Sequence, residues 1–105
     1  MYILNKDEKL KIKIANNFYK KLTGLSFKKN INYGMRFKTK AIETFFMLEK
    51  IDLCITDKNN KIITLIPSLK KKIYINKNAY YIYELPNGYI KKLNLKINTK
   101  LKIVD

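Results

Sequence analysis

Residues 79–88, AYYIYELPNG, place three tyrosines within four positions of a chain whose formal net charge is +15. Tyrosines in a basic protein suggest a nucleic-acid platform, on which bases stack while cations follow the phosphates. A strand over residues 79–85 would instead alternate its side chains between the two faces of a sheet. One face would carry Tyr81, Tyr83 and Leu85, and the other Tyr80, Ile82 and Glu84. Both faces are largely apolar, and no lysine lies between Lys77 and Lys91, so the sequence favours tyrosines that pack in a core or pair across strands.

The segments on either side of this strand also indicate β-structure. Pro86 is expected to end the strand and Gly88 to form the turn after it. Residues 51–66, IDLCITDKNNKIITLI, predict a hairpin, because two apolar runs flank an Asn-rich turn at residues 57–61. Pro67 and Ser68 are expected to close the second strand of this hairpin, since proline has no amide proton to donate.

The N-terminal third predicts one strand and one short helix. Residues 10–14, LKIKI, alternate apolar side chains with lysine, as a half-buried strand does. Asn16 or Asn17 can then cap a helix of about two turns whose apolar side includes Phe18 and Leu22. Gly24 is expected to end that helix. Gly34 is expected to form a turn that leads into an extended segment ending at Phe37.

Three shorter elements are predicted in the remaining sequence. Residues 73–75 are expected to add a short edge strand. Residues 89–95 suggest one or two helical turns, and residues 99–104 suggest a final strand with Leu101 and Ile103 on one side. No repeat, low-complexity tract or flexible linker is found, so residues 1–105 are expected to form a single domain.

Six short motifs, in order, resemble the bacterial and archaeal domain of unknown function family 192. They are Ala15, Gly24-Leu25, Gly34-Met35-Arg36-Phe37, Phe46-Met47, Ile51-Asp52-Leu53 and Glu84-Leu85-Pro86-Asn87-Gly88. The chain departs from the family pattern after Phe46-Met47, where it lacks a Lys-Asn-Thr step and a proline, and at Ser26, where methionine is usual. The resemblance implies an α+β, mainly β fold, with a small curled antiparallel sheet or partly open barrel and one or two short helices. It implies no established activity.

The positive charge has two interpretations. Lys and Arg total 23 against 8 acidic residues, a balance typical of proteins that bind nucleic acid or an anionic surface. However, Arg36 is the one arginine, and arginine is the usual residue for bidentate phosphate and guanine contacts. The chain is also rich in Ile and Asn, which together with Lys indicate adenine- and thymine-rich codons. A solvated lysine surface is therefore favoured over a dedicated basic face.

The sequence also bears on compartment and cofactors. Cys54 is the single cysteine, which excludes an internal disulfide and a cysteine-based zinc site. No apolar run is long enough to span a bilayer, and residues 1–14 lack the apolar block of a signal peptide. A cytoplasmic location is therefore expected. Histidine is absent and the glycines at 24, 34 and 88 stand far apart, so neither a metal, a phosphate loop nor any other cofactor is expected.

Asp52 and Glu84 are the candidate functional carboxylates, because each lies in an otherwise apolar strand, where a charge needs a partner. They could accept hydrogen bonds from turn backbone or pair with lysine, or they could line a pocket with Phe46 and Met47. The first hypothesis is a non-enzymatic domain that binds a small molecule, a glycan or a protein partner in a cleft near Phe46, Met47, Asp52 and Glu84. The alternative is weak polyanion binding without sequence preference, and a third is a hydrolase that uses Asp52 and Glu84.

Overall fold

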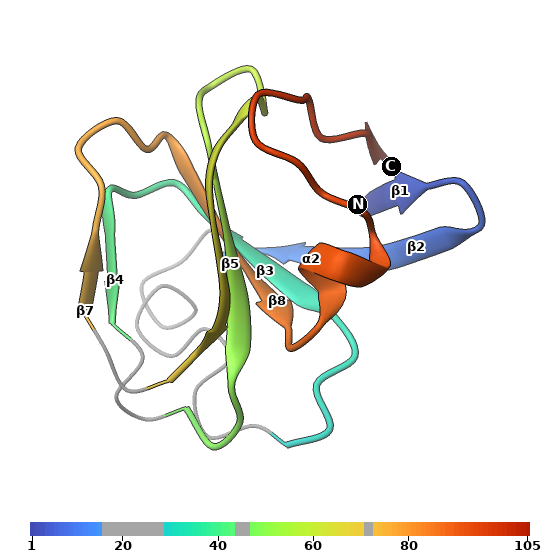
Figure 1. Cartoon of the computed structure of the whole chain (residues 1–105), viewed down its shortest axis with the longest axis horizontal. Helices are drawn as coiled ribbons and strands as arrows, with labels where there is room; N and C mark the ends of the chain where they lie inside the picture. The colour runs from blue at the N-terminus through green and yellow to red at the C-terminus, as the bar shows by residue number, and fades with distance from the viewer. Residues whose placement is uncertain (16–28, 44–46, 71–72) are drawn as a thin grey trace.

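A computed structural model describes residues 1–15, 29–43, 47–70 and 73–105 of the chain (Figure 1). Nine strands and one short helix are found in these residues. The strands are β1 (Tyr2–Asn5), β2 (Glu8–Ile14), β3 (Gly34–Phe37), β4 (Ala41–Glu43), β5 (Ile51–Thr56), β6 (Ile62–Leu69), β7 (Ile73–Ile75), β8 (Tyr81–Pro86) and β9 (Ile103–Val104). The helix is α2 (Tyr89–Lys92). The predicted helix that begins at Asn16 or Asn17 and ends at Gly24 lies outside the described residues.

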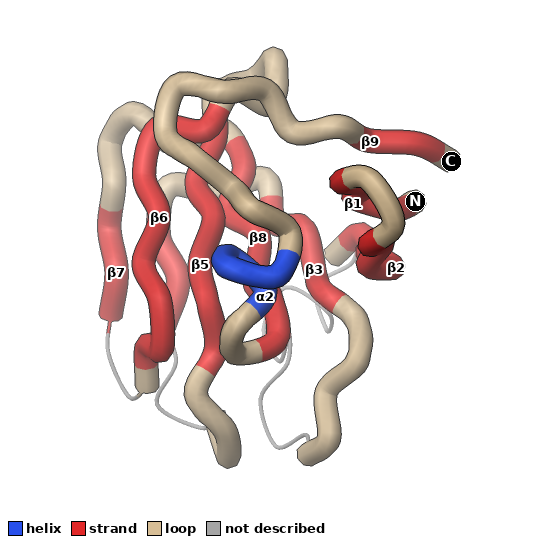
Figure 2. Tube along the Cα trace, turned by 45° about the vertical axis from the view of Figure 1, so that its right-hand side comes forward, coloured by secondary structure: helices blue, strands red, loops and turns tan. Residues whose placement is uncertain are grey.

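Seven strands form one curled sheet in the order β6-β5-β8-β3-β2-β1-β9, and β4 pairs with β7 in a separate two-stranded sheet (Figure 2). The predicted mainly β fold is therefore confirmed. One pairing differs from the antiparallel expectation, because β2 and β3 run parallel. Parallel neighbours need a long connection, and β2 and β3 are well separated in the sequence, since β2 ends at Ile14 and β3 begins at Gly34. The sheet is not a closed barrel: β6 and β9 are its ends, although an isolated bridge joins Lys61 to Lys100.

The hairpin predicted at residues 51–66 is confirmed as β5 and β6. Asn60 adopts φ 63°, and the Asp57 carboxylate accepts hydrogen bonds from the amides of Asn59 and Lys61 at 2.9 Å. The predicted end at Pro67 and Ser68 is wrong, because β6 continues to Leu69. Since β6 is an edge strand whose register shifts opposite β5, a proline is tolerated there without loss of a ladder bond.

The large sheet buries apolar side chains on both faces. One face carries the β4–β7 core, which includes Met35, Phe37, Met47, Ile51, Leu53, Ile55 and Ile82 and is covered in part by Ile42 and Tyr74. The other face carries the α2 core, which includes Ile3, Leu10, Ile12, Cys54, Ile62, Tyr83, Leu85, Leu93 and Leu101. The central strands β5 and β8 separate these cores, which explains why every residue of β5 is buried.

Candidate functional site

Asp52 is a buried carboxylate whose hydrogen bonds all go to backbone amides. Its side chain is 1% exposed. Oδ1 accepts from the Ser68 amide at 3.0 Å, and Oδ2 accepts from the amides of Gly88 at 3.1 Å and Ile90 at 2.9 Å. The expectation that a buried acid accepts hydrogen bonds from turn backbone is confirmed for Asp52. This one side chain thus ties the bend in β6 to the turn between β8 and α2.

The turn between β8 and α2 takes its shape from the residues that the sequence singled out. Pro86 is the last residue of β8, and Gly88 follows with φ 92°, a conformation that costs little only for glycine. Gly88 is the N-cap of α2 and has no side chain to cap the helix. The Asp52 carboxylate caps the helix instead, because it accepts hydrogen bonds from the Gly88 and Ile90 amides and places negative charge at the helix N-terminus.

Glu84 lies on the opposite face of the sheet from Asp52. In the strand register Asp52 pairs with Leu85, whereas Glu84 pairs with Leu53. Since opposed residues share a face and successive residues alternate, Glu84 faces the β4–β7 core and Asp52 the α2 core. Met47 is buried in the β4–β7 core, on the side of Glu84, and Phe46 lies outside the described residues. The structure therefore does not bring the two carboxylates together, and a hydrolytic site that uses both is not formed.

Gly34 has a role other than the predicted turn. It is the first residue of β3 and pairs with Ile12 of β2. A Cβ atom there would lie 2.7 Å from Ile12 Cδ1 and 2.8 Å from the Glu84 carbonyl oxygen, so glycine is needed for close packing between strands. Gly24, the other glycine predicted in a turn, lies outside the described residues.

The three tyrosines of the stretch at residues 79–88 differ in burial. Tyr83 is fully buried in the α2 core, and its hydroxyl donates to Asn60 Oδ1. Tyr80 and Tyr81 are half-buried, with ring centroids 4.7 Å apart. The Arg36 guanidinium lies 4.4 Å from the centre of the Tyr81 ring, and Lys38 Nζ lies 5.0 Å from that of Tyr80. The core interpretation is thus confirmed for Tyr83 and in part for Tyr81, which packs against the α2 core while half-buried. The absence of lysine between residues 77 and 91 did not mean separation from cations in space.

Burial and these contacts shift three ionisation equilibria. Burial raises the pKa of the Tyr83 hydroxyl to about 12, although the nearby Arg36 guanidinium acts in the opposite direction. Burial likewise raises the pKa of the Cys54 thiol to about 12, so Cys54 is an inert thiol near neutral pH. The Tyr80 hydroxyl raises the pKa of Lys38, which keeps that exposed side chain charged.

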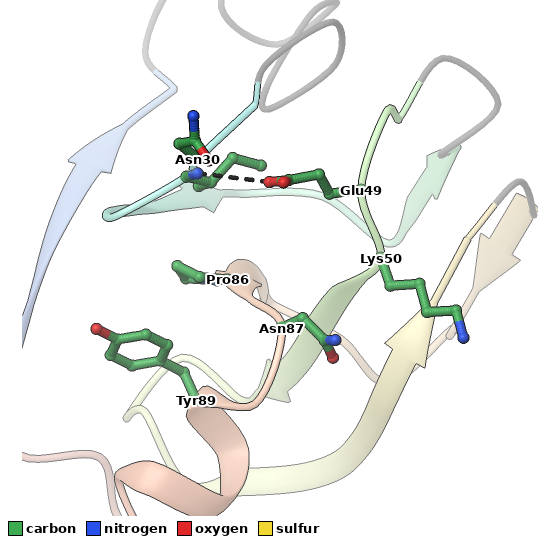
Figure 3. Close-up of a pocket in the computed structure, with 7 residues that line it drawn as sticks. Asn30, Glu49, Lys50, Pro86, Asn87 and Tyr89 are labelled. Atoms are coloured by element: carbon green, nitrogen blue, oxygen red, sulfur yellow. Dashed lines mark hydrogen bonds between the residues drawn. The ribbon is translucent and has the colours of Figure 1, made fainter.

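A pocket of about 370 Å³ lies at the ends of β5 and β8 where the Asp52 network is found. It is lined by Asn30, Ile31, Glu49, Lys50, Pro86, Asn87 and Tyr89. Figure 3 shows Glu49 extending toward the Asn30 segment, with Pro86, Asn87 and Tyr89 on the facing side and Lys50 pointing away. The Ile31 amide donates to Glu49 Oε1 at 3.5 Å, and Ser68 Oγ donates to Asn87 Oδ1 at 2.8 Å, so both walls are held in place.

None of the residues that line this pocket was among the predicted site residues. Glu49 and Lys50 come just before β5, and Asn87 and Tyr89 come just after β8. The signal that could have found them is position: polar residues in loops at the ends of buried strands are commonly the ones that contact ligands. Of the predicted site residues, Asp52 and Glu84 lie in the buried strands β5 and β8 and do not line this pocket.

Neither a metal-binding cluster nor a membrane-spanning helix is found in the described residues. In residues 1–15, 29–43, 47–70 and 73–105, no group of three or more Cys, Asp or Glu side chains is placed to hold a metal ion. Within the same residues, no helix has the length and apolar character needed to cross a bilayer.

The family model for uncharacterized ACR, COG1430 (DUF192) matches residues 2–103. The chain belongs to the DUF192 family. UPF0127 proteins of three archaea are similar: that of Thermococcus sibiricus is 33% identical over 87% of this chain, that of Thermococcus kodakarensis 34% over 82%, and that of Pyrococcus horikoshii 34% over 87%. The chain spans 64%, 60% and 85% of these relatives, so it covers less than two thirds of the two Thermococcus proteins.

Two solved structures share the fold of this DUF192 chain. A protein of Sinorhizobium meliloti, described as a proposed transcription regulator, superposes with a TM-score of 0.80 at 16% identity, covering 96% of this chain and 89% of that one. A protein of unknown function from Novosphingobium aromaticivorans gives a TM-score of 0.78 at 11% identity, covering 97% and 82%. At these identities the likeness shows the fold alone.

Proposed function

We propose that this DUF192 protein is a non-enzymatic binding domain that takes a small hydroxyl-bearing molecule, such as a sugar or the end of a glycan, in the pocket at the ends of β5 and β8. The observation that carries the proposal is the make-up of that pocket. A carboxylate and two carboxamides, from Glu49, Asn30 and Asn87, line it together with Pro86 and the Tyr89 ring.

The chemistry of these groups suits a ligand with both hydroxyls and an apolar face. A carboxylate only accepts hydrogen bonds, whereas a carboxamide both donates and accepts, so the three side chains can satisfy hydroxyl groups in either sense. Pro86 and Tyr89 offer apolar surface on the facing side (Figure 3). The volume of about 370 Å³ is within the usual range for small-molecule sites, and few of its groups are charged.

Two of the residues predicted near the cleft, Asp52 and Met47, support the loops that line this pocket. Asp52 fixes the amides of Gly88 and Ile90, and so sets the position of Asn87 and Tyr89. Met47 is buried two positions before Glu49 and anchors that loop in the β4–β7 core. A rigid support of this kind lowers the entropy lost when a ligand binds, which favours a preformed site.

A titration with sugars tests the proposal. Mono- and disaccharides added to ¹⁵N-labelled protein should shift the amide signals of Asn30, Glu49, Asn87 and Tyr89. The variant Glu49→Gln should weaken binding about tenfold through loss of one charge-assisted hydrogen bond. Glu8→Gln is the matched control, since Glu8 lies on β2 and pairs with Lys92, and it should bind as the wild type does. Saturable shifts elsewhere, or none with any sugar, would contradict the proposal.

Polyanion binding is a second candidate, favoured by the cations stacked on Tyr80 and Tyr81. Arginine and lysine over half-buried rings resemble the mixed surface that binds single-stranded nucleic acid. The protein of similar fold from Sinorhizobium meliloti is described as a proposed transcription regulator. Labelled single-stranded DNA titrated at two salt concentrations tests this candidate. Arg36→Gln/Lys38→Gln should weaken binding more than Lys70→Gln/Lys77→Gln, which removes equal charge elsewhere. Equal losses would leave only nonspecific attraction.

A further inference from the structure

A second pocket, of about 340 Å³, lies between β1, the start of β6 and the chain after α2. Its apolar side chains are Leu4, Ile62, Leu93, Leu95 and Leu101. Ile62, Leu93 and Leu101 belong to the α2 core and are at most 4% exposed, so they form a floor of buried aliphatic groups. Leu4 and Leu95 are half-buried and form part of the walls. The pocket can therefore accommodate an apolar group.

The rim of this pocket is basic. Lys96, Lys100 and Lys102 line it and are exposed, together with the polar side chains of Asn5, Asn94 and Thr99. No acidic residue is among the described residues that line it. The ion pair found in the described part of the chain, Lys92 to Glu8 at 3.9 Å, involves none of these three lysines. Among the residues that the structure describes, no carboxylate thus lies within ion-pair distance of these three lysines.

The walls are preformed by backbone hydrogen bonds. The Ile62 amide donates to the Thr99 carbonyl at 2.8 Å, and the Asn98 amide donates to the Ile62 carbonyl at 2.8 Å. The Leu101 amide donates to the Asn60 carbonyl at 2.9 Å, which anchors the next turn of this segment. On the other side Asn5 Nδ2 donates to the Leu93 carbonyl at 2.6 Å. The segment after α2 is consequently held against β1 and β6 before any ligand arrives.

From this combination we infer that the second pocket binds a small soluble organic anion, with a carboxylate or similar group among the three lysines and an aliphatic body on the leucine and isoleucine floor. Opposite charge at the rim attracts and orients the anionic group, while burial of the chain supplies affinity. The first pocket differs, because the Glu49 carboxylate extends across it and would repel an anion, whereas the Lys50 side chain points away (Figure 3). The two pockets therefore select different ligand chemistries, and this inference does not depend on the proposed function.

Octanoate is a suitable probe, and octan-1-ol is its uncharged counterpart of equal chain length. Octanoate should shift the amide signals of Leu4, Ile62, Leu95 and Leu101 in ¹⁵N-labelled protein, and should bind about tenfold more tightly than octan-1-ol. Signals of Glu49 and Asn87 should stay unchanged. Equal affinity for the two probes, or shifts centred on the first pocket, would overturn the inference.

Charge-matched variants separate a local effect from the overall charge of the protein. The triple variant Lys96→Gln/Lys100→Gln/Lys102→Gln should lose the tenfold preference for octanoate. The control Lys11→Gln/Lys70→Gln/Lys77→Gln removes the same charge from exposed positions outside both pockets and should keep the preference. A loss of equal size in both triple variants would show that net charge alone attracts the anion, which refutes the inference.

An anionic lipid headgroup has the same charge as the probe, so vesicles distinguish a membrane from a soluble ligand. Cosedimentation with phosphatidylglycerol vesicles should be equal for the two triple variants, because a flat surface responds to total charge. Selective loss of vesicle binding in the Lys96/Lys100/Lys102 variant would mean that this face docks on a membrane, and the assignment to a small soluble ligand would be wrong.

Discussion

Tyr83 and Tyr81 lie two residues apart on the same face of β8, yet they differ in burial and in the groups that they contact. Tyr83 is fully buried and its hydroxyl donates to Asn60. Tyr81 is half-buried, and the cation of Arg36 lies over its ring. The period-2 alternation of a strand fixes the face to which a side chain points, but the depth of burial depends on which distant segment covers that face. Asn60, in the turn between β5 and β6, bonds to Tyr83, whereas Tyr81 packs at the margin of the α2 core with the Tyr80 ring beside it and the Arg36 guanidinium over it.

Substitutions at the two ends of β8 should consequently have different effects on the stability of the fold. From Tyr83 to Pro86 the strand is buried and is linked to Asp52, so changes there should act on stability. At Tyr80 and Tyr81 the contacts are cation over ring at half-exposed positions, so changes should have small, local effects.

Tyr83→Ala should lower the free energy of unfolding by about 3–5 kcal/mol, since it removes a fully buried aromatic ring and leaves a cavity. Urea denaturation measures the loss. Tyr83→Phe keeps the ring and removes only the hydroxyl that bonds to Asn60, so it should cost about 1 kcal/mol. A wild-type midpoint for the alanine variant would mean that the buried end of β8 does not support the core.

Asp52→Ala should lower the free energy of unfolding by about 3 kcal/mol, because three backbone amides lose a charged acceptor. Hydrogen exchange should also speed up at the Gly88 and Ile90 amides more than at the amides of β5. Asp7→Ala is the control, as Asp7 is an exposed residue in the turn between β1 and β2. Unchanged exchange at Gly88 and Ile90 would show that Asp52 does not hold the turn before α2.

High pH should weaken the fold through Tyr83. Its pKa rises from 10.0 in the unfolded chain to about 12 in the folded one, because burial disfavours the phenolate. Its contribution is therefore complete below pH 10 and is lost as the pH rises to about 12, where the unfolded chain releases the proton first. The expected slope is about 1.4 kcal/mol per pH unit. Urea denaturation from pH 9 to 11.5 should show that slope reduced in Tyr83→Phe, while Cys54 contributes equally to both proteins.

Local patterns in the sequence predicted most of the large sheet. The alternation of apolar residues with lysine predicted β2, and the Asn-rich turn predicted the hairpin of β5 and β6. Pro86 and Gly88 predicted the end of β8 and the turn that follows it. These features depend on neighbours within a few residues, which a sequence displays directly. The parallel pairing of β2 with β3 and the passage of β6 through Pro67 depend on tertiary contacts, and neither was predicted from the sequence.

The candidate site was predicted less well, for a physical reason. Asp52 and Glu84 were recognised as buried acids, but their separation onto opposite faces follows from the register between β5 and β8. A shift of one residue in that register would exchange the faces, and no local pattern fixes it. The pocket residues Glu49 and Asn87 are brought together because β5 begins beside the point where β8 ends, with Ile51 paired to Pro86.

The contact between Arg36 and Tyr81 should contribute the smallest effect, about 0.5–1 kcal/mol, because a half-exposed cation over a ring gains little beyond its solvated state. A double-mutant cycle with Arg36→Gln and Tyr81→Leu isolates this contact from the loss of either side chain alone. Raising the salt concentration should reduce the coupling energy, since the attraction is electrostatic. Lys13 and Tyr33, with Nζ 4.0 Å from the ring centre, offer a matched pair outside β8. A coupling energy above 2 kcal/mol for Arg36 and Tyr81 would place that end of β8 in the core beside Tyr83, and the contrast between the two tyrosines would disappear.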